Sequence, residues 1–338
     1  MTLDSAVGAL VTDGVRRYGR LPARPQDVDP LDESTRTPRW WRALRLKEWV
    51  GFTLVHPQWA GSMILQDAKY LASSEIYLTH RASGTMTQHA ANARGGSLRL
   101  PASFAGSEAR FAAPGYRIGY DLGTASGTHR LDVDVAATAS SPAVQGELVL
   151  DVRAASPELV VSSRLPGGTL YTTKALYPVA GELHVGGETV VFDPARDLAI
   201  LDEHRSALPY RTRWTWGTFG LRADGGAPIG ANFATRPSVP GGEDESGIWS
   251  TTECEPLTGV LFVPAGDPTG PWRVASDDGR LDVEFRPDGR KGVRHQLGVF
   301  SIDYWQAFGR YHGTLRADGR AYTIDGVPGV LEQMRARL

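Results

Sequence analysis

The middle of the chain gathers residue types that could transfer protons. Residues 197–221 read DLAILDEHRSALPYRTRWTWGTFGL. The ionisable groups are Asp202, Glu203, His204 and Arg205, and the large rings are Tyr210, Trp214 and Trp216. Burial beside apolar rings raises the pKa of a carboxyl group, because loss of water disfavours its charged form. Asp202 is therefore the candidate acid, and His204 is its candidate partner or base.

The predicted catalytic group also includes two neighbours of Asp202 and His204 in this segment. They are Glu203 and Tyr210. Another interpretation leaves no chemistry here: Asp202 and Arg205 form a structural ion pair where a strand enters a sheet, since such pairs also shift pKa values. Residue types alone do not separate these two interpretations.

Trp214 and Trp216 are candidate walls of a substrate pocket. They lie two residues apart, so in a strand they share one face. Aromatic faces stabilise the carbocation that forms when a carbon–carbon double bond is protonated. We expect both rings, and Arg205, to contact the substrate; the alternative is that the rings only fill a core.

Other predicted substrate-binding residues lie outside this segment. Glu253 and Glu255 also share one face of a strand, where repulsion would raise one pKa if both faced a cavity, or where both face solvent. Asp67 lies in an apolar run with Lys69 at the same parity, which also suits an ordinary ion pair. In SIDYWQAFGRYHG, the Tyr304 hydroxyl could orient a polar ligand end while Trp305 packs on the opposite side.

Composition excludes several classes of function. The net charge of −2 gives no electrostatic reason to expect nucleic acid or an anionic membrane as partner, so a small molecule is favoured. Histidine spacing predicts no metal site, the glycine-rich stretches lack the context of a phosphate loop, and no cofactor is expected. Cys254 is the single cysteine, and no run of about 18 apolar residues predicts a membrane span, so a cytoplasmic protein is expected. The oligomeric state is left open.

Short runs of alternating polarity from residue 40 onwards predict a mostly β protein. Residues 1–39 are predicted to form an N-terminal arm, residues 40–200 a first β domain and residues 201–338 a second, with a ligand pocket within or between them. Short helices are expected at residues 5–18 and 330–338. Gly186-Gly187 and five Asp-Gly pairs predict hairpin turns. The pairs begin at Asp224, Asp278, Asp288, Asp318 and Asp325.

Four segments support a family resemblance: KEWVGFTLVHPQWAGSMILQDAKYLASSEIYLTHRASG, LDEHRSALPYRTRWTWGTFG, PWRVASDDGRLDVEFRP and QAFGRYHGTLRADGRAYTIDGVPGVLEQ. Together they resemble an uncharacterised bacterial family of the AttH and carotenoid 1,2-hydratase-like, lipocalin-related superfamily. The resemblance implies two tandem calycin-like antiparallel β-barrels or sandwiches packed together around an apolar pocket. In its hydratase branch an Asp in a segment similar to LDEH, ahead of a Trp-x-Trp pair, lies at the pocket, which here matches Asp202, Trp214 and Trp216.

The relatives implied by this resemblance include cofactor-free hydratases and cyclases of polyenes and isoprenoids, and also lipid-binding proteins. We therefore expect a cofactor-independent hydratase, isomerase or cyclase that acts on a hydrophobic isoprenoid, polyene or lipid-like molecule. The alternative is a carrier that binds such a molecule without changing it.

Overall fold

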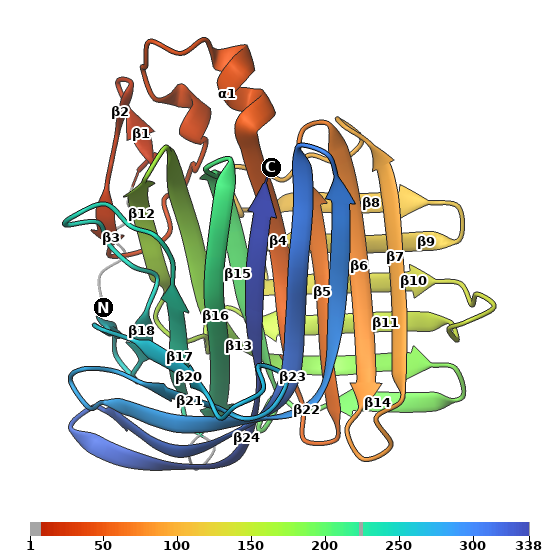
Figure 1. Cartoon of the computed structure of the whole chain (residues 1–338). Coiled ribbons are helices and arrows are strands. Elements are labelled where there is room, and N and C mark those ends of the chain that lie inside the picture. The colour runs from red at the N-terminus through yellow and green to blue at the C-terminus, as the bar shows by residue number, and fades with distance from the viewer. Residues whose placement is uncertain (1–7, 223–225, 338) are drawn as a thin grey trace.

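The structure is a computed structural model that describes residues 8–222 and 226–337. Among these residues, strands form a 13-stranded sheet, a nine-stranded sheet and a two-stranded hairpin. No helix in this part of the chain is long and apolar enough to cross a membrane. Figure 1 shows the two large sheets packed side by side, with helix α1 at one end.

The N-terminal region contains β1 (Val11–Thr12), β2 (Val15–Arg16), the 3-10 helix η1 (Pro30–Asp32) and α1 (Arg39–Arg45). The first sheet contains β3 (Gly19–Leu21), β4 (Leu46–Val55), β5 (Trp59–Asp67), β6 (Leu71–His80), β7 (Met86–Arg94), β8 (Ser107–Ala113), β9 (Tyr116–Leu122), β10 (Thr128–Val135), β11 (Val144–Asp151), β12 (Leu159–Leu165), β13 (Gly168–Val185), β14 (Glu188–Phe192) and β15 (Leu198–Ala207). The second contains β16 (Arg211–Arg222), β17 (Pro228–Thr235), β18 (Gly247–Trp249), β19 (Cys254–Pro256), β20 (Leu261–Pro264), β21 (Trp272–Ala275), β22 (Leu281–Leu297), β23 (Phe300–Ala317) and β24 (Arg320–Arg337).

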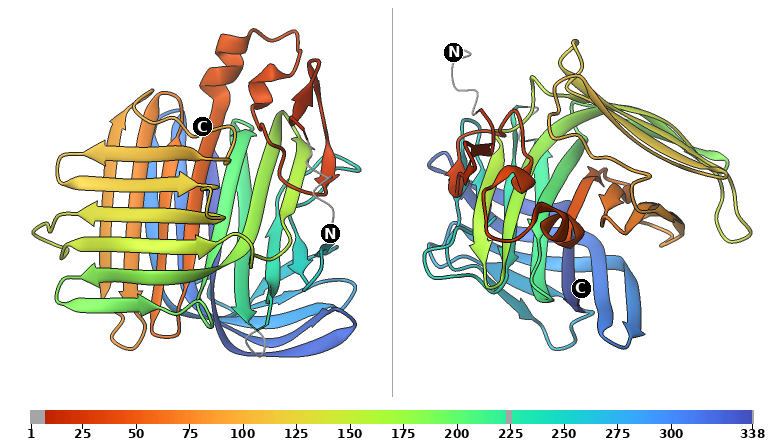
Figure 2. Two further views of the ribbon diagram at one scale, coloured as in Figure 1. Left: turned by 180° about the vertical axis from the view of Figure 1, so that it is seen from behind. Right: turned by 90° about the horizontal axis from the view of Figure 1, so that it is seen from above.

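The first sheet folds over on itself through the long strand β13. Its first part pairs with β12 and β15, and its last part pairs with β11 and β14. Gly181 lies at this change with φ +115, and a Cβ atom there would lie 2.2 Å from the carbonyl oxygen of Glu147. Only glycine therefore permits this close backbone approach. The two halves cross in Figure 2 and enclose one large apolar core, in which Phe52 packs against Tyr120.

The second sheet curls around an aromatic core that includes Phe219, Phe233, Phe285 and Tyr311. Its three longest strands, β22 to β24, run antiparallel with bulges after Pro287 and after Tyr311. Bulges bend a strand and increase its twist, which curves the sheet into a half-barrel.

One face of β4, β6, β13 and β15 packs against the second sheet. Tyr77 lies in one apolar cluster with Trp216 and Phe308, and Trp249 packs among apolar residues of the first sheet. The Tyr77 hydroxyl also donates to Oε1 of Gln306 at 2.8 Å. Side chains on this face of β15 are therefore enclosed between two sheets.

The mostly β fold of two packed, barrel-like sheets is confirmed. The Gly186-Gly187 turn joins β13 to β14 as predicted, and Asp278-Gly279 and Asp318-Gly319 lie in hairpin turns. Asp288-Gly289 and Asp325-Gly326 instead lie at the bulges inside β22 and β24. Asp224-Gly225 falls outside the described residues.

The predicted terminal helices are wrong. Within residues 8–18 the chain forms the β1–β2 hairpin, and Asp13 and Gly14 occupy the turn with φ 52 and 76, which a helix does not allow. Residues 330–337 continue β24, because pairing with both β16 and β23 outweighs their helical propensity.

The predicted domain limits, 1–39, 40–200 and 201–338, stay a prediction. Strand β15 crosses position 200 and pairs with β4 and β13 up to Ala207, so the second sheet begins with β16. In the N-terminal arm, β3 pairs with β12 and thereby joins the first sheet.

Candidate active site

Strand β15 divides its ionisable residues between its two faces. Side chains alternate along a strand, so Asp202 and His204 point towards the second sheet, whereas Glu203 and Arg205 point to the opposite side. The register places Lys174 of β13 directly across from Asp202. Alternation along β15 and its register with β13 thus bring the side chains of Asp202, Lys174 and His204 together between the sheets.

Lys174 is the centre of the resulting charged cluster and is only 1% exposed. Its Nζ atom contacts Oδ1 of Asp202 and lies 3.5 Å from Oε2 of Glu245 and 3.5 Å from Nε2 of His204. The same His204 nitrogen lies 3.3 Å from both Asp202 and Glu245, and Arg236 pairs with Glu245. Each of these charges therefore has an oppositely charged neighbour inside the protein.

Three tryptophans form the walls of this cluster. Trp49 donates from its indole nitrogen to Oδ2 of Asp202 at 3.0 Å and stacks on His204 with ring centroids 4.3 Å apart. Nζ of Lys174 lies 4.8 Å above the ring of Trp216. Trp214 donates to Oε1 of Glu332 at 2.8 Å. The rings hold the ionisable groups in place through both stacking and hydrogen bonds.

Glu332 enters the pocket from β24 of the second sheet. Its Oε2 atom accepts hydrogen bonds from the Tyr304 hydroxyl and from Nε2 of Gln306, both at 2.9 Å. Both sheets therefore contribute a carboxyl group to one pocket.

The environment shifts the two carboxyl pKa values in opposite directions. Burial acts to raise the pKa of Asp202, but the Lys174 ammonium and His204 outweigh it and hold this pKa well below its ordinary value. Burial raises the pKa of Glu332, and the nearby charge of Asp202 adds to this effect. Burial also lowers the pKa of Lys174, and it lowers that of His204 to about 4. At neutral pH Asp202 is thus an anion and His204 a neutral imidazole.

The free volume inside this pocket is about 20 Å³. A polar cavity needs roughly 10–15 Å³ to hold one water molecule. The described arrangement therefore accommodates water beside the ionisable groups, and a larger molecule requires the tryptophan walls to move.

Several predicted site residues do lie together here. The pocket is lined by Asp202, His204, Trp214 and Trp216, and the Tyr304 hydroxyl donates a hydrogen bond to its Glu332. Their catalytic or binding roles stay predictions, but the acid form expected for Asp202 does not agree with its lowered pKa.

The ion pair between Asp202 and Arg205, which was the alternative to a catalytic role, does not form, because the two side chains lie on opposite faces of β15. Arg205 pairs with Glu48 at 2.5 Å and with Glu203 at 3.2 Å. Glu203 also pairs with Arg24 of the N-terminal arm at 2.7 Å. Glu203 and Arg205 therefore belong to a second charged group within the first sheet.

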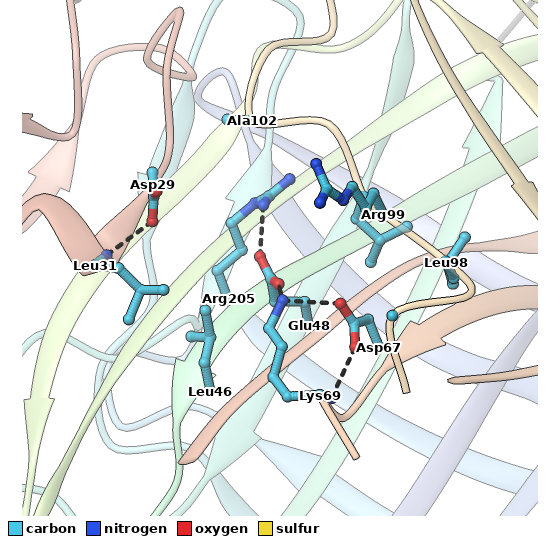
Figure 3. Close-up of a pocket in the computed structure, with 12 residues that line it drawn as sticks. Asp29, Leu31, Leu46, Glu48, Asp67, Lys69, Leu98, Arg99, Ala102 and Arg205 are labelled. Atoms are coloured by element: carbon cyan, nitrogen blue, oxygen red, sulfur yellow. Dashed lines mark hydrogen bonds and ion pairs between the residues drawn. The ribbon is translucent and has the colours of Figure 1, made fainter. Parts of the chain in front are cut away.

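A surface pocket next to this second group contains Asp67. Figure 3 shows Lys69 between Asp67 and Glu48, and Arg205 on the other side of Glu48. The Lys69 Nζ atom lies 2.8 Å from Oδ2 of Asp67, so Asp67 has the ordinary ion pair that was the alternative to a binding role.

The other predicted residues lie away from the pocket between the sheets. Tyr210 is exposed and donates to the carbonyl oxygen of Val299. Trp305 packs near Trp272, at a centroid distance of 6.0 Å. Glu255 pairs with Arg280 at 2.6 Å, and Glu253 is exposed.

Sequence reasoning missed six residues of the pocket: Trp49, Lys174, Leu208, Arg236, Glu245 and Glu332. Lys174 carried a signal, because it interrupts the run TLYTTKALYPVA, and lysine is almost never fully buried unless it is paired. Glu332 was hidden by the assignment of its segment to a helix.

We expect stability to fall as the pH drops from about 6.5 to about 4. The pKa of His204 and that of His129, also buried, are both lowered from 6.5 to about 4, so the unfolded chain binds these protons more tightly than the folded one. Each contributes on the order of 3 kcal/mol across this window. The raised pKa values of Glu332 and Glu158 act in the opposite direction.

Urea unfolding at pH 7 and pH 5 measures this dependence. His204→Asn should reduce the pH dependence, whereas His184→Gln, at an exposed position, should leave it unchanged. An equal pH dependence in the wild type and in His204→Asn contradicts the assignment to His204.

Fold and site together define a β protein of two packed sheets with an ionisable cluster enclosed between them. The fold is similar to that of CghA, with a TM-score of 0.56, 10% sequence identity and coverage of 87% of this chain and 88% of that chain. CghA with Sch210972 gives a TM-score of 0.54 at 10% identity, with the same coverage. The chain belongs to the family described as Domain of unknown function (DUF2804), whose model matches residues 2–338.

A weaker structural likeness is to kievitone hydratase from Nectria haematococca, with a TM-score of 0.48, 12% identity and coverage of 85% of this chain and 88% of that chain. A comparison with curated proteins finds no match. The family model thus shows the family, and the likeness to CghA shows the fold. The lipocalin-related superfamily and its bacterial hydratase branch stay predictions.

Proposed function

We propose that the protein is a cofactor-independent acid–base enzyme of the hydratase, isomerase or cyclase type. The substrate is a hydrophobic isoprenoid, polyene or lipid-like molecule that enters the pocket between the sheets. One observation carries this proposal: Asp202 and Glu332 share a pocket, and their pKa values are shifted in opposite directions. At the same pH, such a pair supplies a neutral acid that can donate a proton and an anion that can stabilise positive charge.

Glu332 takes the role of the acid in this proposal. A carboxyl group with a raised pKa can hold the proton that a carbon–carbon double bond receives. The Asp202 carboxylate and the faces of Trp214 and Trp216 then stabilise the positive charge on carbon. The sequence predicted Asp202 as the acid, and its pairing with Lys174 is the reason for the change.

His204, supported by Asp202, takes the role of the base. In a hydration, Glu332 gives a proton to one carbon, and His204 removes a proton from the water that adds to the other. In an isomerisation or cyclisation, His204 removes the proton from carbon instead. Protons balance in each case, because one is donated and one is accepted.

The other two predicted catalytic residues have supporting roles in this proposal. Glu203, fully buried behind β15, holds the strand through Arg24 and Arg205. Tyr210 lies outside the pocket, four residues ahead of Trp214, and its position suits the entrance better than the chemistry.

Carriage of a hydrophobic molecule is the second candidate function. A cavity of about 490 Å³ on the first sheet favours it, because this space is much larger than the pocket between the sheets and includes Phe104 and Tyr177 in its lining. CghA, which shares the fold, has been solved with Sch210972. Ligand binding without chemistry needs only such apolar walls and an anchor.

Turnover in D₂O separates the two candidates. Purified protein is incubated in D₂O with isoprenoid and polyene fractions, and mass spectrometry follows deuterium incorporation or the addition of water. We expect new products with the wild type and with Glu188→Gln, a substitution at an exposed position of β14, but none with Asp202→Asn. Tight binding without any product supports a carrier, and equal product with Asp202→Asn rejects the proposed site.

A further inference from the structure

Exposed apolar side chains gather at one end of the molecule. They come from α1, the β5–β6 turn, the β15–β16 connection and the β22–β23 hairpin. We call the group the aromatic rim: Trp40, Trp41, Leu44, Tyr70, Leu71, Tyr210, Val299 and Phe300. Trp40 is 65% exposed and Phe300 is 51% exposed. Figure 1 places α1, the β22–β23 hairpin and the end of β24 at this same end.

Contacts between side chains and backbone join the four segments into one surface. Lys47 donates to the carbonyl oxygen of Leu44 at 3.0 Å, and its Nζ atom lies 4.8 Å above the ring of Tyr70. Tyr70 and Phe300 line one apolar surface cavity of about 450 Å³. Tyr210 donates to the carbonyl oxygen of Val299, which links the β15–β16 connection to the hairpin.

Cations surround the aromatic rim. Arg42 and Arg45 donate to backbone carbonyl oxygens rather than to carboxylates, and Arg337 donates to the Ser301 hydroxyl. The remaining cations of the group are Arg36, Lys47 and Arg211. None of these six side chains has a carboxylate within ion-pairing distance among the residues that the structure describes. Arg39 of α1 differs, because it pairs with Asp29 and Asp32. In the described part of the chain, the rim therefore has six cations without a paired carboxylate, although the whole chain has a net charge of −2.

Helix α1 has the composition of a segment that lies at a bilayer surface. It reads RWWRALR, and all seven residues are at least partly exposed. Tryptophan prefers the headgroup region, and arginine and lysine near the surface interact with anionic lipids. A protein-binding surface concentrates its apolar groups in a charge-depleted centre, whereas the rim spreads them over four protruding tips with cations between them.

We propose that the aromatic rim docks the protein on an anionic lipid bilayer. Trp40, Trp41 and Phe300 insert among the headgroups, while the surrounding cations bind lipid phosphates. This proposal does not rest on the chemistry of the pocket between the sheets. It places Tyr210, and with it the connection that leads to Trp214, against the bilayer, where hydrophobic molecules are concentrated.

Co-sedimentation with vesicles tests the docking. We expect the full chain to bind vesicles of phosphatidylglycerol and phosphatidylcholine at low salt, and to bind pure phosphatidylcholine vesicles much more weakly. Trp40→Ser/Trp41→Ser/Phe300→Ser should weaken binding to anionic vesicles about tenfold or more. Arg36→Gln/Arg211→Gln should weaken it about 30-fold, which corresponds to about 1 kcal/mol for each cation.

Matched controls carry the same types of change on other strands. Leu261→Ser/Val263→Ser removes two exposed apolar side chains of β20, and Arg316→Gln/Arg320→Gln removes two exposed cations at the β23–β24 turn. Both should bind as the wild type does. Thermal unfolding verifies that every variant is folded.

Three results overturn the proposal: no binding by the wild type, equal binding by the rim variants, or equal loss in the controls. Analytical ultracentrifugation identifies the competing occupant. A dimer of the wild type that is lost in Trp40→Ser/Trp41→Ser/Phe300→Ser, without vesicle binding, assigns the aromatic rim to a second copy of the chain.

Discussion

Glu332→Gln is expected to lower turnover by about two to four orders of magnitude, because a positioned general acid typically contributes a factor of this size. The amide keeps the shape of the carboxyl group and can still accept from Trp214 at the position of Oε1, but its NH2 group then faces the NH2 donor of Gln306. It has no acidic proton to give to carbon. The rate constant should therefore fall, and thermal unfolding measures the cost of the lost hydrogen bond separately.

The pH dependence of the rate provides a second measurement. Burial raises the pKa of Glu332, so wild-type activity should decline as the pH rises through that pKa and the acid loses its proton. Glu332→Gln should lose this decline together with the activity, whereas Glu188→Gln should keep both. A normal rate in Glu332→Gln transfers the acid role to another group, with Lys174 the next candidate because its pKa is lowered by burial.

Much of the fold could be predicted because strand patterns and turn residues are local signals. The Gly186-Gly187, Asp278-Gly279 and Asp318-Gly319 turns need only short-range chemistry, and each lies where a hairpin was expected. The prediction of a helix at residues 330–337 failed because the structure of this segment depends on strands that are distant in the sequence. The leucine, glutamate, methionine and arginine of this segment favour a helix in isolation, and only the neighbouring strands β16 and β23 make them a strand.

The sequence could place the residues of β15 in the candidate site, but not their partners from other strands. Strand parity already places Asp202 and His204 on one face and Arg205 on the other, so the alternative of an ion pair between Asp202 and Arg205 could have been rejected from the sequence. The partner that replaces Arg205 could not be found in this way. Lys174 is 28 residues away in the chain, and the β13–β15 register that brings it to Asp202 is a property of the folded sheet.

Asp202→Asn is expected to destabilise the folded protein by about 3 kcal/mol, since removal of one partner leaves a buried charge uncompensated. Lys174 is 1% exposed, and its contact with Asp202 is lost in this variant. Glu245 still lies 3.5 Å from Nζ, which places the effect at the low end of the range of about 3–5 kcal/mol known for buried pairs. Urea unfolding of Asp202→Asn, of Lys174→Met and of the double variant Lys174→Met/Asp202→Asn measures these changes in the free energy of unfolding.

The double variant decides what the buried pair is for. Replacement of both charges should recover most of the lost stability, because buried ion pairs are often no more stabilising than uncharged groups of similar size. If the recovered protein is also inactive, the pair is retained for chemistry rather than for the fold. Losses that simply add in the double variant would mean that Lys174 and Asp202 do not act as a pair. The low pKa assigned to Asp202, and the support that Asp202 gives to His204 as the base, would then have to be abandoned.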